Sequence, residues 1–258
     1  MLELAQRLRG RVRAREPLVG MFVKTPVHHN VELLALGGLD FAVLDAEHAP
    51  FDLDAIDRCI LAGRAHGMAV VVRIPEGAHT FASACADMGA AAIVSPHMCD
   101  GAAARKSANA IRFAEGGRGL SPSPRAGSYG GIGLSEFVRR SDSVLGLWAQ
   151  IEDAAALDRL DEIAAVEAVD CLFVGRVDLA RSLGAESIAA PEVRRATERV
   201  IAAAAANGRA SAVFVGSLDE VRSFHPLGAS IFIVGSDQSM LRSQARALRD
   251  GFPSAVRA

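Results

Sequence analysis

Short apolar runs rich in Val, Ile, Leu and Phe alternate with amphipathic segments of helical periodicity along almost the whole chain. The apolar runs have the length of buried strands and lie at residues 18–23, 41–45, 69–74, 91–95, 144–151, 170–174, 210–215 and 230–234. Helical segments follow them at residues 31–36, 53–65, 80–88, 101–113, 154–165, 192–206, 218–224 and 238–249. Parallel strands joined by helical crossovers have this rhythm, and about eight such units close a barrel. We therefore predict an α/β protein with the (β/α)8 TIM-barrel fold.

Length and composition favour one domain. The chain has 258 residues, half of them apolar, so a single barrel domain at residues 1–258 can fill its core. The charged amphipathic segment at residues 1–17 is predicted to be an N-terminal helix that caps the bottom of the barrel. Because it contains no long apolar run, we expect neither a secretory signal nor a membrane span, and we place the protein in the cytoplasm.

The charge balance and the cysteine pattern argue against nucleic-acid binding, a disulfide framework and a thiolate metal site. Lys plus Arg (28 residues) nearly equals Asp plus Glu (30 residues), whereas nucleic-acid binding needs an extended basic surface. We therefore expect no nucleic-acid partner. The cysteines at positions 59, 85, 99 and 171 form no C-x-x-C motif, which favours buried free thiols over disulfides or a thiolate metal site.

One segment, residues 114–133, interrupts the alternation of strands and helices. It is rich in Gly, Ser and Pro and has neither helical nor strand periodicity. Loops of this length in compact domains are usually functional or disordered, and composition does not reveal whether this one reaches the top of the barrel.

Charged residues stand at the carboxyl ends of four very apolar runs. Asp45 ends FAVLD, Arg73 ends AVVVR, Glu152 follows VLGLWAQI, and Asp178 follows CLFVGRV. In a (β/α)8 barrel these ends meet at one mouth, where the active sites of this fold lie. Any one of these residues could be a helix N-cap, and for Asp45 alone that explanation is about as good as a functional one. For the whole set that explanation weakens, because a helix N-terminus repels Arg and Glu is a poor N-cap.

Two of these residues, Glu152 and Asp178, follow neighbouring strands with no Cys or multi-His cluster nearby. Paired carboxylates suit a hard cation such as Mg²⁺ or Mn²⁺, which keeps positions open for substrate oxygens. A 2-oxo acid fills such positions with its carbonyl and carboxylate oxygens. Arg73 then shares the charge that grows on the enolate oxygen, a role typically worth about 10²- to 10³-fold in rate.

Two further residues at the expected mouth have competing interpretations. His48, in DAEHAPFD, could exchange a proton with the aldehyde-derived oxygen, or it could be a capping or solvated loop residue. Lys24, in KTP, permits a Schiff-base mechanism, but a lone lysine there is more often solvated.

Several motifs in a fixed order carry a family resemblance. They are GLDFAVLDAEHAPFD (38–52), VVRIP (71–75), DMGAAAIVSP (87–96), GGRG (116–119), QIED (150–153) and FVGRVDLARSLG (173–184). Together they resemble the HpcH/HpaI family of class II, metal-dependent pyruvate aldolases, also described as 4-hydroxy-2-oxoheptanedioate or 2-keto-3-deoxyaldarate aldolases. The resemblance runs through nearly the whole chain.

This resemblance implies a set of catalytic and metal-binding residues. Glu152 and Asp178 bind Mg²⁺, Mn²⁺ or Co²⁺, and Arg73 holds the pyruvyl oxygen. His48 and Asp87 form a dyad that serves the aldehyde oxygen. Asp87 precedes its strand, so spacing alone would place it at the opposite end of a lone barrel, and the dyad would form across a subunit boundary.

The resemblance also implies the surroundings of the substrate and the assembly. Gln150 and Asp45 support the water and hydrogen-bond network, while backbone amides near Gly175, Val177 and Asp178 cradle the pyruvate carboxylate. Family members assemble as hexamers and serve the catabolism of aromatic compounds or aldarates. Where many members have proline, this chain has Arg176, which leaves the acceptor specificity open.

The leading hypothesis is reversible cleavage of a 4-hydroxy-2-oxo acid to pyruvate and an aldehyde through a pyruvate enolate. Oxaloacetate decarboxylation would use the same enolate. A citryl- or malyl-CoA lyase would need a nucleotide-binding extension, for which no segment is evident. A catalytically silent barrel that serves as a scaffold is the alternative outside enzymes, since fold alone does not fix function.

Overall fold

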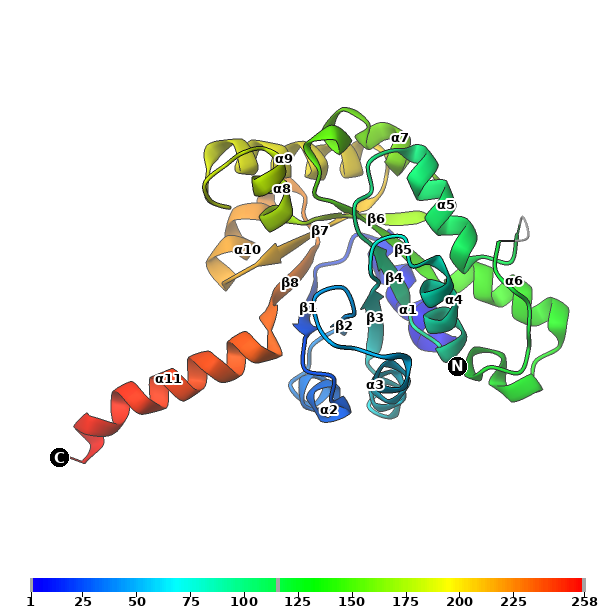
Figure 1. Ribbon diagram of the computed structural model, residues 1–258, viewed down its shortest axis with the longest axis horizontal. Helices are drawn as coiled ribbons and strands as arrows, with labels where there is room; N and C mark the ends of the chain where they lie inside the picture. Colours follow the sequence, from blue (N-terminus) through cyan, green and yellow to red (C-terminus); the bar gives the residue numbers. More distant parts are fainter. Residues whose placement is uncertain (1, 115–116, 257–258) are drawn as a thin grey trace.

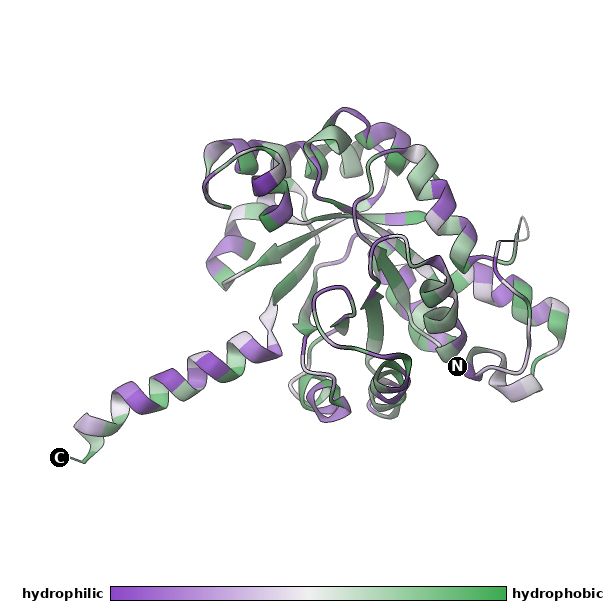
Figure 2. Cartoon of the chain, in the orientation of Figure 1, coloured by the Kyte–Doolittle hydropathy of each residue, from purple (hydrophilic) through white to green (hydrophobic). Residues whose placement is uncertain are grey.

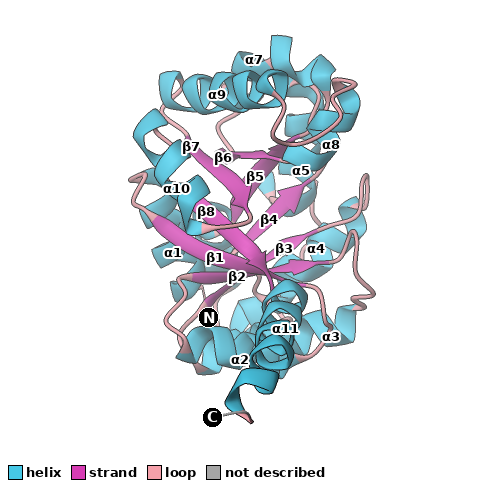
Figure 3. Ribbon diagram, turned by 90° about the vertical axis from the view of Figure 1, so that its left-hand side faces the viewer, coloured by secondary structure: helices cyan, strands magenta, loops and turns pink. Residues whose placement is uncertain are grey.

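A closed barrel of eight parallel strands forms the centre of the computed structural model, which describes residues 2–114 and 117–256 (Figures 1 and 3). The strands are β1 (Leu18–Val23), β2 (Phe41–Asp45), β3 (Ala69–Arg73), β4 (Ala92–Ser95), β5 (Gly146–Ile151), β6 (Val169–Val174), β7 (Ala210–Val215) and β8 (Ile231–Ser236). They follow one another in chain order, and β1 closes the barrel by pairing with β8. The predicted (β/α)8 barrel is confirmed.

Helices surround the strands. They are α1 (Glu3–Arg13), α2 (His28–Leu36), α3 (Leu53–Ala65), α4 (His79–Met88), α5 (Gly101–Ile111), α6 (Leu134–Val144), α7 (Leu160–Ala164), α8 (Arg176–Ser182), α9 (Pro191–Ala206), α10 (Leu218–Phe224) and α11 (Asp237–Ala255). Short 3-10 helices are η2 (Arg125–Gly130), η3 (Ala154–Asp158) and η4 (His225–Leu227). Within residues 2–114 and 117–256, no helix combines the length and the apolar character that a bilayer span requires.

Helix α1 is the predicted N-terminal capping helix. Its buried face, which includes Leu8 and Val12, packs below the barrel interior. Arg9 extends from this face to the fully buried carboxylate of Asp170 at the start of β6, with Nε 2.8 Å from Oδ2. Arg13 binds the other oxygen of Asp170 at 2.7 Å. Helix α1 therefore covers the amino ends of the strands through apolar packing and paired charges.

The core has two layers that follow the alternation of side chains along each strand. Phe41 and Val43 point into the barrel, where Trp148 packs edge-on against Phe41 with ring centroids 5.4 Å apart. Their neighbours Ala42 and Leu44 face the helices. Gly20 lies against the ring of Phe41, so any side chain at this position would collide with the ring. Figure 2 shows the strands as the most continuously hydrophobic part of the molecule.

The segment at residues 114–133 passes along the outside of the barrel, and its residues 115 and 116 lie outside the described part. Arg125 in η2 pairs with Asp57 of α3 at 2.6 Å. Arg118 pairs with Asp87 at the end of α4 and donates to Ser141 of α6 at 3.1 Å. The described part of this segment therefore packs against α3, α4 and α6, and these contacts do not bring it over the mouth.

Helix α11 projects away from the barrel (Figure 1). Ser236 begins it with a capping box, and Asp237 accepts hydrogen bonds from the backbone amides of Lys24 and Thr25 at 2.9 and 3.0 Å. None of its described residues is buried. Leu241, Ala245, Leu248 and Phe252 recur at the spacing of one helix face and form what we term the α11 stripe.

Candidate active site

A cavity of about 630 Å³ opens at the carboxyl ends of the strands. It is lined by most of the predicted site residues: His48, Arg73, Gln150, Glu152, Gly175, Val177 and Asp178. These residues come from the carboxyl ends of β3 and β5, from Gly175 and the first turn of α8 after β6, and from the β2–α3 loop. Because a closed parallel barrel brings these ends to one mouth, residues far apart in sequence share this cavity.

Asp45 lies at the side of the cavity and binds two cations. Arg73 contacts both of its oxygens, with Nε 3.0 Å from Oδ1 and Nη2 2.8 Å from Oδ2. The Nζ atom of Lys24 lies 3.0 Å from Oδ2. Burial opposes ionisation of Asp45, but the hydrogen bond and charge of Arg73, and then the charge of Lys24, hold the pKa of this carboxyl below its usual value. Asp45 is therefore an ionised anchor that fixes Arg73.

Asp45 caps the turn after β2, but it is not the N-cap of the following helix. Its Oδ1 accepts a hydrogen bond from the backbone N–H of His48 at 3.1 Å, so it does cap the turn after β2. The N-cap of α3, however, is Asp52, which accepts from the N–H of Ala55 at 2.8 Å.

Lys24 is poorly suited to Schiff-base chemistry. Its Nζ atom is engaged in an ion pair with the buried carboxylate of Asp45, whereas a Schiff-base lysine needs an amine that is free to attack the substrate. The geometry therefore favours a metal-dependent mechanism over a lysine Schiff-base mechanism.

Glu152 is the most buried carboxylate that lines the cavity, with 2% of its surface exposed. It accepts hydrogen bonds from the backbone N–H of His97, at 2.9 Å, and from the amide of Gln150. Burial raises the pKa of Glu152, and the nearby negative charge of Asp178 adds to this effect, although Gln150 and His97 oppose it. Because Glu152 and Asp178 line the same cavity and their negative charges repel each other, a cation bound near them would be stabilised.

The residues around Glu152 fit a hard divalent ion. The Oε1 atom of Gln150 is buried without a hydrogen-bond partner, so an unused oxygen acceptor lies beside Glu152. Any Cβ atom at Gly175 would come 2.6 Å from Glu152 Oε2, so glycine keeps this approach open. In the part of the chain that the structure describes, no three His, Cys, Asp or Glu side chains cluster as a metal site. An ion here would have two carboxylate ligands and would complete its shell with water or substrate oxygens.

Glu47 is a site residue that the sequence analysis missed. Its side chain is 10% exposed, and its Oε2 lies 3.4 Å from Arg73 Nη1 and 3.8 Å from His48 Nε2. Burial, together with the charges of Glu152 and Asp45, raises its pKa to about 7 despite the opposing charge of Arg73. The same end-of-strand argument that selected Asp45 would have found it, since Glu47 stands two residues later in DAEHAPFD.

Glu47→Gln should stabilise the metal-free protein at pH 8 and leave it nearly unchanged at pH 4.5. Because the pKa of Glu47 is raised from 4.5 to about 7, the folded protein keeps a proton that the unfolded chain releases. The free energy of unfolding of the wild type therefore falls by on the order of 3 kcal/mol as pH rises from 4.5 to about 7. Glutamine, which does not titrate, removes this loss. Denaturant unfolding between pH 4.5 and 8 measures the difference. Exposed Glu186→Gln is the control, and a pH-independent effect of Glu47→Gln would contradict the prediction.

Asp87 lies apart from the other predicted site residues within one chain. It is near the carboxyl end of α4, which begins after β3 and runs to the amino end of β4, and its partner is Arg118. His48, with its side chain 53% exposed, is at the other end of the barrel. The His48–Asp87 dyad thus remains a prediction that requires a second copy of the chain.

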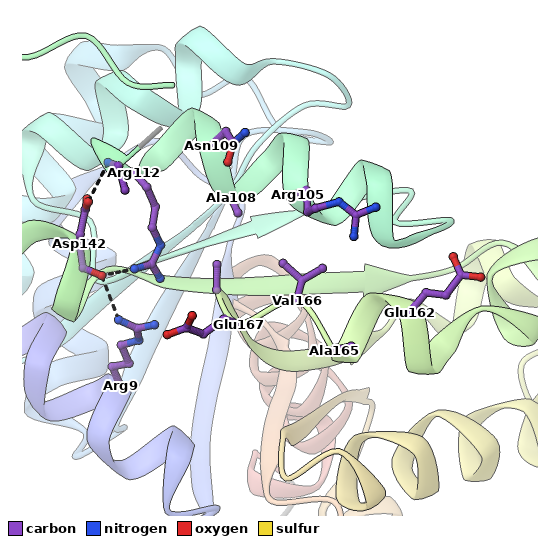
Figure 4. Close-up of a pocket in the computed structure, with 12 residues that line it drawn as sticks. Arg9, Arg105, Ala108, Asn109, Arg112, Asp142, Glu162, Ala165, Val166 and Glu167 are labelled. Carbon is purple, nitrogen blue, oxygen red and sulfur yellow. Dashed lines mark hydrogen bonds between the residues drawn. The ribbon is translucent and has the colours of Figure 1, made fainter. Parts of the chain in front are cut away.

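A second cavity, of about 510 Å³, lies towards the amino ends of the strands (Figure 4). Arg9 and Arg112 both donate to the carbonyl oxygen of Asp142, whose carboxylate accepts from the backbone amides of residues 113 and 114. None of the predicted site residues is among the described residues that line it. The cavity at the mouth is therefore the candidate active site.

Comparisons with known proteins show the family and the fold. The model of the family described as HpcH/HpaI aldolase/citrate lyase matches residues 18–244. A 5-keto-4-deoxy-D-glucarate aldolase from Shigella boydii is 33% identical over 225 residues, which cover 86% of this chain and 87% of the relative. The crystal structure of an HpcH/HpaI aldolase/citrate lyase family protein from Burkholderia cenocepacia has a TM-score of 0.89 at 30% identity, covering 98% of this chain and all of that one. Protein CitE from Mycobacterium tuberculosis, solved with magnesium and acetoacetate, shares the fold with a TM-score of 0.59 at 19% identity, covering 88% of each chain.

Proposed function

Because the chain belongs to the HpcH/HpaI aldolase/citrate lyase family and is a carbon–carbon lyase, we propose that it reversibly cleaves a 4-hydroxy-2-oxo acid to pyruvate and an aldehyde. The observation that carries the proposal is the buried carboxylate of Glu152, which lines one cavity with Asp178 and Arg73 and whose pKa is raised by burial and, in part, by the charge of Asp178. The name of the Shigella relative, an aldolase of a keto acid, supports this substrate class. Residues 1–258 make one aldolase domain in this proposal.

Glu152 and Asp178 would hold the divalent cation, which is Mg²⁺, Mn²⁺ or Co²⁺. When bound there, the cation supplies Lewis acidity next to the 2-oxo group of the substrate. The magnesium in the CitE complex supports this choice of ion. Gln150 orients Glu152 through its amide N–H. The backbone amides near Gly175, Val177 and Asp178, at the start of α8, would bind the substrate carboxylate.

His48 transfers the proton in the proposed reaction, and Arg73 stabilises the enolate oxygen. His48 accepts the proton of the C4 hydroxyl group, directly or through water, while the C3–C4 bond breaks and releases the aldehyde. The bond electrons pass to the keto oxygen of the resulting pyruvate enolate. The guanidinium of Arg73 donates to this oxygen, since Asp45 and Glu47 fix it at the cavity wall. Protonation of the enolate at C3 then gives pyruvate. Asp87 of a neighbouring copy orients His48.

The protein acts as a homo-oligomer in this proposal, and the resemblance implies a hexamer. The α11 stripe supports it, because Leu241, Leu248 and Phe252 are 74%, 75% and 62% exposed on a helix that projects from its own barrel. On α2, Leu33 and Leu36 are 64% and 73% exposed. Large exposed apolar surfaces of this kind are typical of interfaces between protein chains.

Removal of the metal tests the proposed function. Protein stripped with EDTA should lose pyruvate formation from 4-hydroxy-2-oxo acids and regain it with Mg²⁺, Mn²⁺ or Co²⁺, because two carboxylates alone cannot polarise the keto group. A coupled assay for pyruvate with aldehydes of several lengths and charges measures this. Activity that survives EDTA but is lost on borohydride treatment in the presence of pyruvate would establish a lysine Schiff base instead.

A further inference from the structure

Arg176 is a buried cation at the candidate active site to which the proposed mechanism gives no role. It is the first residue of α8, it is 5% exposed, and it lines the cavity at the mouth. In sequence it stands between Gly175, which lies against Glu152, and Asp178, the second proposed metal ligand.

The guanidinium of Arg176 is directed to the next strand and helix. Its Nε and Nη2 atoms both donate to the carbonyl oxygen of Phe214 in β7, at 3.1 and 2.9 Å. Nη2 also lies 2.7 Å from Oε1 of Glu220 in α10. The other oxygen of Glu220 accepts from the backbone N–H of Gly216 at 2.6 Å, and Arg176 covers the ring of Phe224 at 5.2 Å. The side chain therefore ties the start of α8 to the end of β7 and the first turns of α10.

The first turn of α8 has few local interactions that would hold it in place. The helix has only seven residues and no side-chain N-cap, so local interactions hold its first turn weakly. A Cβ atom at Gly175, the residue before it, would come 2.6 Å from Glu152 Oε2 and 2.9 Å from Glu152 Cβ, so any larger residue would push Glu152 aside. Glycine at this position also gives the backbone more conformational freedom. Asp178 lies in that first turn, so the direction of its carboxylate depends on how firmly the turn is held.

We propose that Arg176 is a positioning residue that holds the first turn of α8 so that the Asp178 carboxylate faces Glu152. This inference rests on the proposed function, because it assigns Glu152 and Asp178 to one cation. The two hydrogen bonds to the carbonyl oxygen of Phe214 and the ion pair with Glu220 fix the guanidinium at two points, which a single contact would not do.

Binding of Mn²⁺, followed by electron paramagnetic resonance on the full chain without substrate, tests the proposal. Arg176→Met keeps the apolar contact with Phe224 but removes every donor, so the dissociation constant should rise about tenfold, as is common when the partners of metal ligands are lost. Arg194→Met is the matched control. Arg194 lies 5.5 Å from the same Phe224 ring but binds Glu198 and Ser223 instead, so its loss should change the dissociation constant less than twofold.

Glu220→Gln separates positioning from general destabilisation. It removes one anchor of Arg176 without changing any residue of α8, and it should weaken Mn²⁺ binding about threefold in the wild type but not in Arg176→Met. This non-additivity would show that the two residues act together. If Arg176→Met fails to fold, the weaker binding expected of the Glu220→Gln single variant still tests the proposal. Equal affinities of wild type, Arg176→Met and Glu220→Gln, with Glu152→Gln unable to bind, would overturn the positioning role and leave the proposed function intact. If wild type itself binds no Mn²⁺, the proposed function fails, and the positioning role fails with it.

Discussion

Glu152→Gln should lower kcat/KM for aldol cleavage about 10³-fold and leave the metal-free protein at least as stable as the wild type. The loss of activity follows because a carboxylate is exchanged for a neutral amide in a set of two ligands. Metal stabilisation of charge in the transition state is worth several kcal/mol, and each 1.4 kcal/mol is about tenfold in rate. Pyruvate release at saturating Mg²⁺ measures the activity.

The retained stability follows from the burial of Glu152. Because burial and Asp178 raise the pKa of this carboxyl, its ionised form opposes folding when no cation is bound, and glutamine removes the charge. Glutamine can still accept from the His97 N–H, and Gln150 can turn its unpartnered Oε1 towards the new amide. Denaturant unfolding in EDTA measures this effect.

Exposed Glu76→Gln, in the β3–α4 loop, serves as the control for Glu152→Gln and should keep activity within about threefold. A Glu152→Gln protein that retained a tenth of the wild-type activity would rule out the proposed role of this residue.

Leu248→Glu should dissociate the assembled protein. Burying one leucine side chain is worth about 1.5–3 kcal/mol, and a two-fold symmetric contact contains the substitution twice. The dissociation constant should therefore rise roughly 10²- to 10⁴-fold, and the charge that must then be buried adds to this effect. The fold of each barrel should survive, because Leu248 is 75% exposed within its own chain.

Light scattering after size exclusion at several protein concentrations measures the assembly. Arg246→Gln, on the opposite face of α11, is the control and should leave the mass unchanged, since Arg246 is 83% exposed and its one ion pair, with Asp250, is local. A wild-type protein that remained monomeric at about 10 μM, or a Leu248→Glu protein with unchanged mass, would refute the role of the α11 stripe.

The sequence predicted the barrel strands well, because a strand buried on both sides is a continuous apolar run. The bounds of β1, β2, β7, α3 and α10 agree residue for residue with the predicted ranges. Two helices were missed. Helix α6 was overlooked because it follows the irregular segment at residues 114–133, and α8 because seven residues are too few to show a period. The predicted last helix ended at residue 249, but α11 continues to Ala255.

The site was predictable where it depends on the order of strands and unpredictable where it depends on packing. Asp45, Arg73, Glu152 and Asp178 were found because strand ends converge in a closed barrel. The raised pKa of Glu47 depends on how deeply this residue is buried among other charges, which spacing cannot show. Likewise, the ties from Arg176 to Phe214 and Glu220 cross between separate βα units.

The pairing of Arg9 with Asp170 also limits how early α1 can dock during biosynthesis, because these partners are separated by 161 positions in the chain. The helix made first cannot settle until β6 has emerged from the ribosome, and β1 must wait for β8, which ends at Ser236. At roughly 5–20 residues per second, this takes about 10–50 s. During that interval the apolar face of α1 is open to chaperones, so substitutions there should affect yield in the cell more than catalysis by protein that has already folded.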